Sequence, residues 1–92
     1  MRLGTAKQQP SERLLYTVDY AEVLTDEDHP EVATVTVTPE GLNVDTPFTV
    51  DTRVRFWVSG GTSGVSYKVE LTVTTADGRI LQDEITLRIK EL

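Results

Sequence analysis

The feature that most constrains this chain is an unbroken alternation of apolar and polar side chains that begins at Val65. The apolar members are Val65, Tyr67, Val69, Leu71 and Val73, and the residues between them are Ser66, Lys68, Glu70 and Thr72. Successive side chains of a β-strand point to opposite faces of a sheet, so the pattern predicts a strand with one buried and one solvent-facing side. The rest of the chain is organised around this strand.

A second alternating run precedes it, over residues 53–58. Val54, Phe56 and Val58 fall on one side of the predicted strand, whereas Trp57, the only tryptophan, falls on the other. Trp57 is therefore either turned inward by a bulge or exposed as an anchor on the surface, and the pattern leaves both positions open. We expect it to help stabilise the domain.

The two runs are joined by a polar, glycine-rich loop over residues 59–64. The chain has to cross between two strands within these six residues, which include Gly60, Gly61 and Gly64. Such a crossing uses positive φ angles, which glycine adopts without steric cost, so we expect at least one of the three to have a positive φ. The same reasoning applies to Gly78, in a predicted hairpin turn after Thr75.

Further runs predict strands over residues 13–19, 32–38, 42–50 and 80–92, the third of them interrupted at Thr46-Pro47. No ten-residue stretch repeats its apolar residues with the period of a helix. About seven short strands separated by turns are typical of an immunoglobulin-like sandwich. The predicted fold class is therefore all-β, a single antiparallel immunoglobulin-like β-sandwich.

Tyr67 has the sequence position of a tyrosine corner, close to the start of the penultimate strand. In such a corner the ring packs in the core and the hydroxyl group bonds to backbone a few residues upstream. The alternative is that Tyr67 is simply one aromatic residue in an alternating run.

Residues 1–12 contain little that can enter a core, and we interpret them as an extended N-terminal arm ahead of a sandwich domain over residues 13–92. Pro10 cannot donate a backbone hydrogen bond and disfavours a helix. Because the arm is polar, we expect it to be mobile in the isolated protein and ordered against another chain in an assembly.

The formal net charge of −6 is distributed unevenly. Residues 19–52 contain nine acidic residues and no Lys or Arg, whereas residues 1–18 carry a balance of +2 and residues 53–92 a balance of +1. Nucleic-acid binding requires a basic surface, so an acidic middle argues against it. Unlike patches suit contact between copies of the chain, although acidic loops also simply keep a small domain soluble.

The sequence lacks the residues that several classes of function require. The absence of cysteine removes disulfides and thiolate chemistry, and we expect neither a secretory signal nor a membrane span of ~20 apolar residues. His29, the only histidine, lies in a polar loop, and the glycine-rich loop lacks the lysine of a P-loop. We predict no enzymatic activity, no cofactor and no metal centre. Whether the acidic loop over residues 25–31 binds a cation stays open, since it lacks the central glycine of an EF-hand.

Several short motifs, taken together, support a resemblance to known proteins that spans residues 7–92. They are Lys7, Pro10, Leu14, Tyr16, Asp19 and Tyr20 near the start, Gly41-Leu42-Asn43-Val44 in the middle, the block from Trp57 to Val69, and Thr74-Thr75-Ala76-Asp77-Gly78-Arg79. Together these residues resemble a group of short tailed-phage proteins known as fibre–tail adaptor proteins.

The resemblance implies a non-enzymatic structural protein of the virion, made in the bacterial cytoplasm and assembled at a bacteriophage tail or neck. Its partners would be other virion proteins and further copies of itself, as in a homo-oligomeric ring. A capsid decoration protein is one alternative, and a glycan- or receptor-binding module with Trp57, Tyr20 and the acidic loop as its surface is another. The candidate interface residues are Arg2, Leu3, Lys7, Pro10 and Tyr20, and the candidate structural residues are Trp57, Gly60, Gly61, Gly64, Tyr67 and Gly78.

Overall fold

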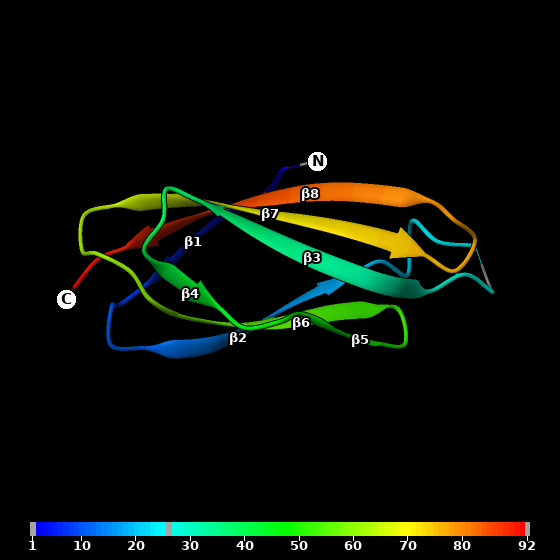
Figure 1. The fold of residues 1–92 in the computed structure, drawn as a ribbon, viewed down its shortest axis with the longest axis horizontal. Coiled ribbons are helices and arrows are strands. Elements are labelled where there is room, and N and C mark those ends of the chain that lie inside the picture. The colour runs from blue at the N-terminus through cyan, green and yellow to red at the C-terminus, as the bar shows by residue number, and fades with distance from the viewer. Residues whose placement is uncertain (1, 26, 92) are drawn as a thin grey trace.

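A computed structural model of the chain describes residues 2–25 and 27–91, apart from the side chains of Arg2 and Leu3. Every regular element in these residues is a β-strand. The strands are β1 (Arg2–Gln8), β2 (Arg13–Asp19), β3 (Pro30–Thr38), β4 (Leu42–Val44), β5 (Phe48–Val50), β6 (Arg53–Gly60), β7 (Ser66–Thr75) and β8 (Ile80–Ile89). They form the two layers of a β-sandwich (Figure 1).

The two sheets follow the strand order of an immunoglobulin-type sandwich. Sheet A has the order β1-β8-β7-β3, and sheet B has the order β2-β6-β4, with β5 also paired to β6. Leaving β1 aside, this places β2, β6 and β4/β5 opposite β3, β7 and β8, as strands B, E and D lie opposite C, F and G in that fold. The predicted all-β sandwich is confirmed. It has one more strand than expected, and β1 adds a parallel pair to sheets that are otherwise antiparallel.

The core lies between the sheets and is made by alternate residues of the central strands. Its most deeply buried side chains, each no more than 2% exposed, are Val54, Phe56, Val58, Tyr67, Val69, Leu71, Val73, Leu87 and Ile89. Burying one such side chain contributes roughly 1.5–3 kcal/mol, so these facing rows are the main source of stability. The alternation in β6 and β7 therefore marks the core correctly.

Tyr67 fastens the glycine-rich loop to the start of β7. Its ring is buried, and its hydroxyl oxygen accepts a 2.9 Å hydrogen bond from the backbone N–H of Thr62, five residues upstream. This is the hydrogen bond of a tyrosine corner. The corner also explains why residue 41 is a glycine, because a Cβ on Gly41 would lie only 3.2 Å from the Tyr67 hydroxyl oxygen.

The loop glycines adopt the backbone conformations that the sequence predicts. Gly60, Gly61 and Gly64 have φ angles of 77°, 93° and 89°, and Gly78 in the β7–β8 turn has 87°. Gly61 is doubly constrained, because a Cβ there would lie 2.7 Å from Cγ1 of Ile89. A Cβ on Gly64 would meet nothing within 4 Å.

Replacing these glycines by alanine should separate backbone strain from crowding. Gly64→Ala adds only the cost of a left-handed conformation, about 1–2 kcal/mol. Gly61→Ala adds a clash with the core side chain of Ile89, and overpacking of this kind costs about 1–3 kcal/mol more. Urea unfolding of the two variants measures the difference. Equal losses of unfolding free energy would show that Ile89 moves aside freely.

Candidate interaction surfaces

The N-terminal segment belongs to sheet A. Strand β1 runs parallel to β8, with Thr5 opposite Thr86 and Lys7 opposite Arg88, and the two strands lie side by side in Figure 1. This differs from the prediction that residues 1–12 form an arm apart from the sandwich. The reason is that strand pairing is made by backbone groups, so the open edge of β8 accepts a polar segment as readily as an apolar one.

The predicted interface residues of this segment are distributed along one edge of the sandwich. The side chain of Lys7 is exposed on β1, and Pro10 is half-buried in the turn between β1 and β2. The backbones of Arg2 and Leu3 lie in β1, whereas their side chains lie outside the described part of the chain.

Gln8 ties β1 to the opposite sheet and was missed by the sequence analysis. Its side chain is buried; Nε2 donates hydrogen bonds to the backbone oxygens of Val58 and Glu12, both 2.9 Å away. Its Oε1 accepts a 2.8 Å bond from the Tyr16 hydroxyl. One amide therefore joins β1 of sheet A to β2 and β6 of sheet B. The only sign of its burial in the sequence is that Gln8 lies two residues after Ala6, and therefore on the same, inward face of the strand.

We expect Gln8→Ala to destabilise the sandwich. The substitution leaves the buried Val58 carbonyl and the Tyr16 hydroxyl without their partner, which costs about 1–3 kcal/mol. Gln9→Ala is the matched control: Gln9 bonds to Glu12 through its backbone N–H and C=O groups, so the loss of unfolding free energy should stay within about 0.5 kcal/mol. Denaturant unfolding compares the two variants. An equal effect would show that Gln8 does not link the sheets.

Tyr20 is a core residue rather than an interface residue, which corrects its predicted place on the surface. It is 3% exposed, and its hydroxyl donates a 2.6 Å hydrogen bond to Oδ2 of Asp83, which is equally buried. Burial raises the pKa of Tyr20, and the hydrogen bond and charge of Asp83 raise it further. A turn in which Val23 and Leu24 donate to the Tyr20 carbonyl follows the residue. Asp83 occupies an inward position of β8, and that inward carboxylate was the overlooked signal.

Trp57 occupies one of the two positions that the sequence left open. Strand β6 is regular there, with Leu15 opposite Trp57, so the ring lies on the outer face of sheet B. It is half-buried beneath Arg13, whose guanidinium carbon is 4.2 Å from the ring centroid. The same guanidinium group is 2.8 Å from Oδ2 of Asp45, so a cation–π contact and an ion pair share one arginine.

The outer face of sheet B combines arginine, aromatic and aliphatic side chains. We call it the arginine–aromatic face; it consists of Arg13, Leu15, Phe48, Val50, Arg53, Arg55 and Trp57. Phe48 is 41% and Val50 is 40% exposed. Arg53 lies 3.4 Å from the Asp19 carboxylate, and Arg55 donates to the Thr17 hydroxyl at 3.1 Å. Trp, Phe and Arg are enriched in protein–protein interfaces, so this face is the candidate protein-binding surface.

The acidic loop before β3 is braced by one buried carboxylate. Oδ1 of Asp28 accepts hydrogen bonds from the backbone N–H groups of His29 and Asp77, both at 3.0 Å. Burial alone would raise the pKa of Asp28, but these bonds and that of the Thr75 side chain outweigh it and lower the pKa. Asp26 lies outside the described residues, and among those described no three His, Asp or Glu side chains gather as a metal site requires.

The lowered pKa of Asp28 predicts a stability change in acid. The folded chain favours the carboxylate form, so this stabilisation is present above the unfolded pKa of about 3.9 and is lost as the pH falls through the lower folded value. The melting temperature of Asp28→Asn should therefore lie furthest below that of the parent near neutral pH, and the gap should shrink below about pH 4. Thermal unfolding across this range measures it, with Asp77→Asn as control. A gap independent of pH would show that the charge does not stabilise the fold.

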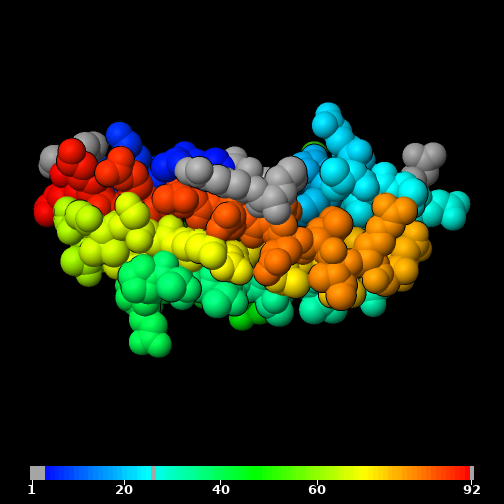
Figure 2. Space-filling view, turned by 90° about the horizontal axis from the view of Figure 1, so that it is seen from above, coloured from blue at the N-terminus to red at the C-terminus, as the bar shows by residue number. Residues whose placement is uncertain are grey.

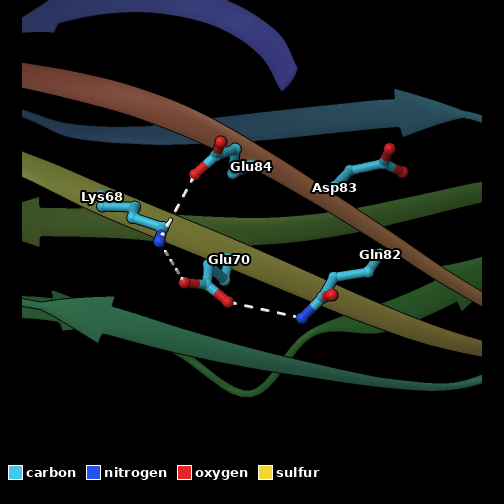
Figure 3. Close-up of a pocket in the computed structure, with 5 residues that line it drawn as sticks. All are labelled: Lys68, Glu70, Gln82, Asp83 and Glu84. Carbon is cyan, nitrogen blue, oxygen red and sulfur yellow. Dashed lines mark hydrogen bonds and ion pairs between the residues drawn. The ribbon is translucent and has the colours of Figure 1, made fainter. Parts of the chain in front are cut away.

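A shallow hollow on the outer face of sheet A holds a network of charged side chains (Figure 3). Nζ of Lys68 lies 2.8 Å from the Glu70 carboxylate and 3.7 Å from that of Glu84, and Gln82 donates to Glu70 at 3.4 Å. The hydrogen bond and charge of Glu70, with the charge of Glu84, raise the pKa of Lys68. A lysine held in its charged form bridges two carboxylates here and is not prepared to act as a base.

The described chain is thus a β-sandwich whose buried polar groups join its own strands, and the outer face of its sheet B is a candidate protein-binding surface. The chain belongs to a family of phage proteins, described as podophage GP4 fiber-tail adaptor protein gp77, whose family model matches residues 8–88. A comparison with the curated proteins gives no match. The predicted resemblance is thereby confirmed, and membership implies a structural role in the tail of the virion. No helix within residues 2–25 and 27–91 is long and apolar enough to cross a membrane.

Proposed function

We propose that the chain is a non-enzymatic assembly module of the phage tail or neck that joins other virion proteins by burying its exposed sheet surfaces. The observation that carries the proposal is the arginine–aromatic face on a domain of the fiber-tail adaptor family. Phe48 and Val50 supply apolar area that a partner would remove from water. Arg53 and Arg55 supply donors for the carboxylate or carbonyl groups of that partner.

The face is partly organised before any partner arrives. Asp45 and Trp57 hold Arg13, and Asp19 holds Arg53. Fixing a long side chain costs about 0.5–1.5 kcal/mol when it occurs on binding, and here part of that cost is met within the folded domain. Several copies arranged around a tail would add their individual contacts through avidity, so a modest contact per copy is sufficient.

The N-terminal segment is the second proposed contact. In this structure β1 pairs with β8, so an exchange of residues 1–12 with a neighbouring chain would first have to release Gln8 from Val58 and Tyr16. The proposal therefore places Lys7 and Pro10 at an interface with β1 still in its own sheet. Their exposed and half-buried positions support that arrangement.

The two alternatives differ in what they require. A glycan- or receptor-binding module needs Trp57, Tyr20 and the acidic loop on one surface, but Tyr20 is buried and Arg13 lies over the Trp57 ring. A capsid decoration protein would use a sandwich of the same kind at a different position in the particle, so only its location separates it from a tail component.

The test is incorporation into particles. We expect the double variant Phe48→Ser/Val50→Ser to fold, because both side chains are exposed, and to enter particles at least about tenfold less than the parent. Ile80→Ser is the control, since Ile80 is 71% exposed but lies on sheet A. A phage that lacks the gene is complemented with each variant, and electron microscopy of the particles then gives the amount of the incorporated protein and its position in the virion. Normal incorporation of the double variant would remove the face from the mechanism, and density on the capsid shell would favour a decoration protein.

A further inference from the structure

Three of the four sheet edges in the described chain carry features that discourage pairing with another strand. On β1, Gly4 has a φ of 125° beside a register shift, and Lys7 adds a charge. The β4/β5 edge consists of two three-residue strands separated at Pro47. Strand β2 begins and ends with charged residues, Arg13 and Asp19, both in ion pairs. Charges, prolines, bulges and short strands are the usual means by which proteins protect an edge.

The fourth edge, β3, carries such features only at its start, where Pro30 and Glu31 lie beside a register shift between Pro30 and Val32. The rest of the strand, residues 32–38, contains no charged side chain and no proline. Strand β3 is hydrogen-bonded to β7 on one side, while β5, which contacts it from sheet B, pairs with β6. In Figure 2, which looks onto sheet A, β3 forms the lower margin of the sheet beside β7. Its second row of backbone N–H and C=O groups is therefore open to another strand.

We infer that β3 pairs antiparallel with β3 of a second copy, so that the two A sheets become one continuous sheet across a two-fold axis. A symmetric contact of this kind requires a strand that is complementary to itself. In the register centred on Val35, Thr34 lies opposite Thr36 of the second copy, and Val32 lies opposite Thr38. Thr–Thr pairs are favourable across a ladder, and no residue from 32 to 38 places like charges opposite each other.

The flanking acids also fit this register. Glu31 lies opposite Pro39 of the second copy, so no carboxylate faces another directly. Both Glu31 and Glu40 nevertheless lie near the ends of the ladder, where they repel each other weakly through water. Added salt screens that repulsion and should strengthen the contact, whereas it weakens a contact made by opposite charges.

The size of the edge predicts a weak dimer. The ladder over residues 32–38 extends about 24 Å, and the sandwich is 19–20 Å across. A contact of about 24 by 20 Å covers roughly 480 Å² on each copy, which is less than the ~800 Å² per partner of a standard stable interface. We therefore expect dissociation constants in the micromolar range and not the nanomolar range. This inference refines the proposed function by naming one self-association surface, and it can fail while that function stands.

The experiment is sedimentation of the full chain over a range of concentrations and salt, with two paired variants. Thr34→Lys/Thr36→Lys places lysines opposite lysines across the two-fold axis and should weaken dimerisation at least about tenfold. Inside one copy Thr36 lies opposite Glu70, so that lysine has a partner and the fold should be retained. Thr72→Lys/Thr74→Lys puts the same charges on the same face one strand further in, on β7, and should leave dimerisation near that of the parent.

A concentration-dependent dimer that grows with salt and is lost only in the β3 variant supports the inference. A parent chain that stays monomeric at several hundred micromolar overturns it, as does a dimer that the β3 variant retains. A monomer whose β3 variant fails to enter particles also overturns it, because the edge then receives a strand of another virion protein. Amide exchange in the β3 strand, compared at low and high concentration, identifies the edge directly in the parent.

Discussion

The backbone groups at the edges of the two sheets are the constraint on which most of this structure depends. Every edge strand presents N–H and C=O groups that pairing has not used, and these groups must meet water, a strand or a side chain. The chain gives β8 a parallel partner in β1, and it divides the β4/β5 edge at Thr46-Pro47. It leaves β3 paired on one side only. The treatment of each edge thus decides which parts of the domain are closed and which remain available.

Buried polar groups then fix the two layers relative to each other. Gln8 joins β1 to β2 and β6, and Tyr20 after β2 bonds to Asp83 of β8. Asp28 acts within sheet A, where it joins the loop before β3 to the β7–β8 turn through the Asp77 N–H. Gln8, Tyr20 and Asp83 are deeply buried, and a buried polar group without its partner costs about 1–3 kcal/mol, so their contacts favour one alignment of the sheets. A sandwich held in this way offers its outer faces as rigid surfaces.

Most of the fold could be predicted because apolar and polar residues alternate with a period of two along strands that are buried on one face. Residues 13–19 form β2 within the predicted bounds, and the break at Thr46-Pro47 separates β4 from β5. Tyr67 makes the hydrogen bond of a corner because its position relative to the loop is a local property. These features depend on neighbours in sequence, for which alternation and turn chemistry are sufficient guides.

What could not be predicted depends on partners far away in sequence. The polar composition of β1 says nothing about the free edge of β8, which lies about eighty residues further along the chain. Tyr20 looked like a surface aromatic because its partner, Asp83, is 63 positions away. Trp57 could not be placed without knowing that β6 pairs regularly with β2, so that Leu15 lies opposite Trp57 and the ring stays on the outer face. In each case the deciding contact joins two elements that only the folded topology brings together.

The positions of the arginine–aromatic face and the β3 edge suggest how one small domain connects two components. A protein that connects two components needs two surfaces that can be occupied at once. The arginine–aromatic face is the outer side of sheet B, whereas the β3 edge lies at the margin of sheet A. A partner strand added to β3 extends sheet A in its own plane, so it leaves the outer side of sheet B uncovered. In the proposed assembly, self-association and partner binding therefore use different surfaces, and two copies joined at β3 would present two arginine–aromatic faces on the same side. That arrangement turns a modest contact per copy into a bivalent one.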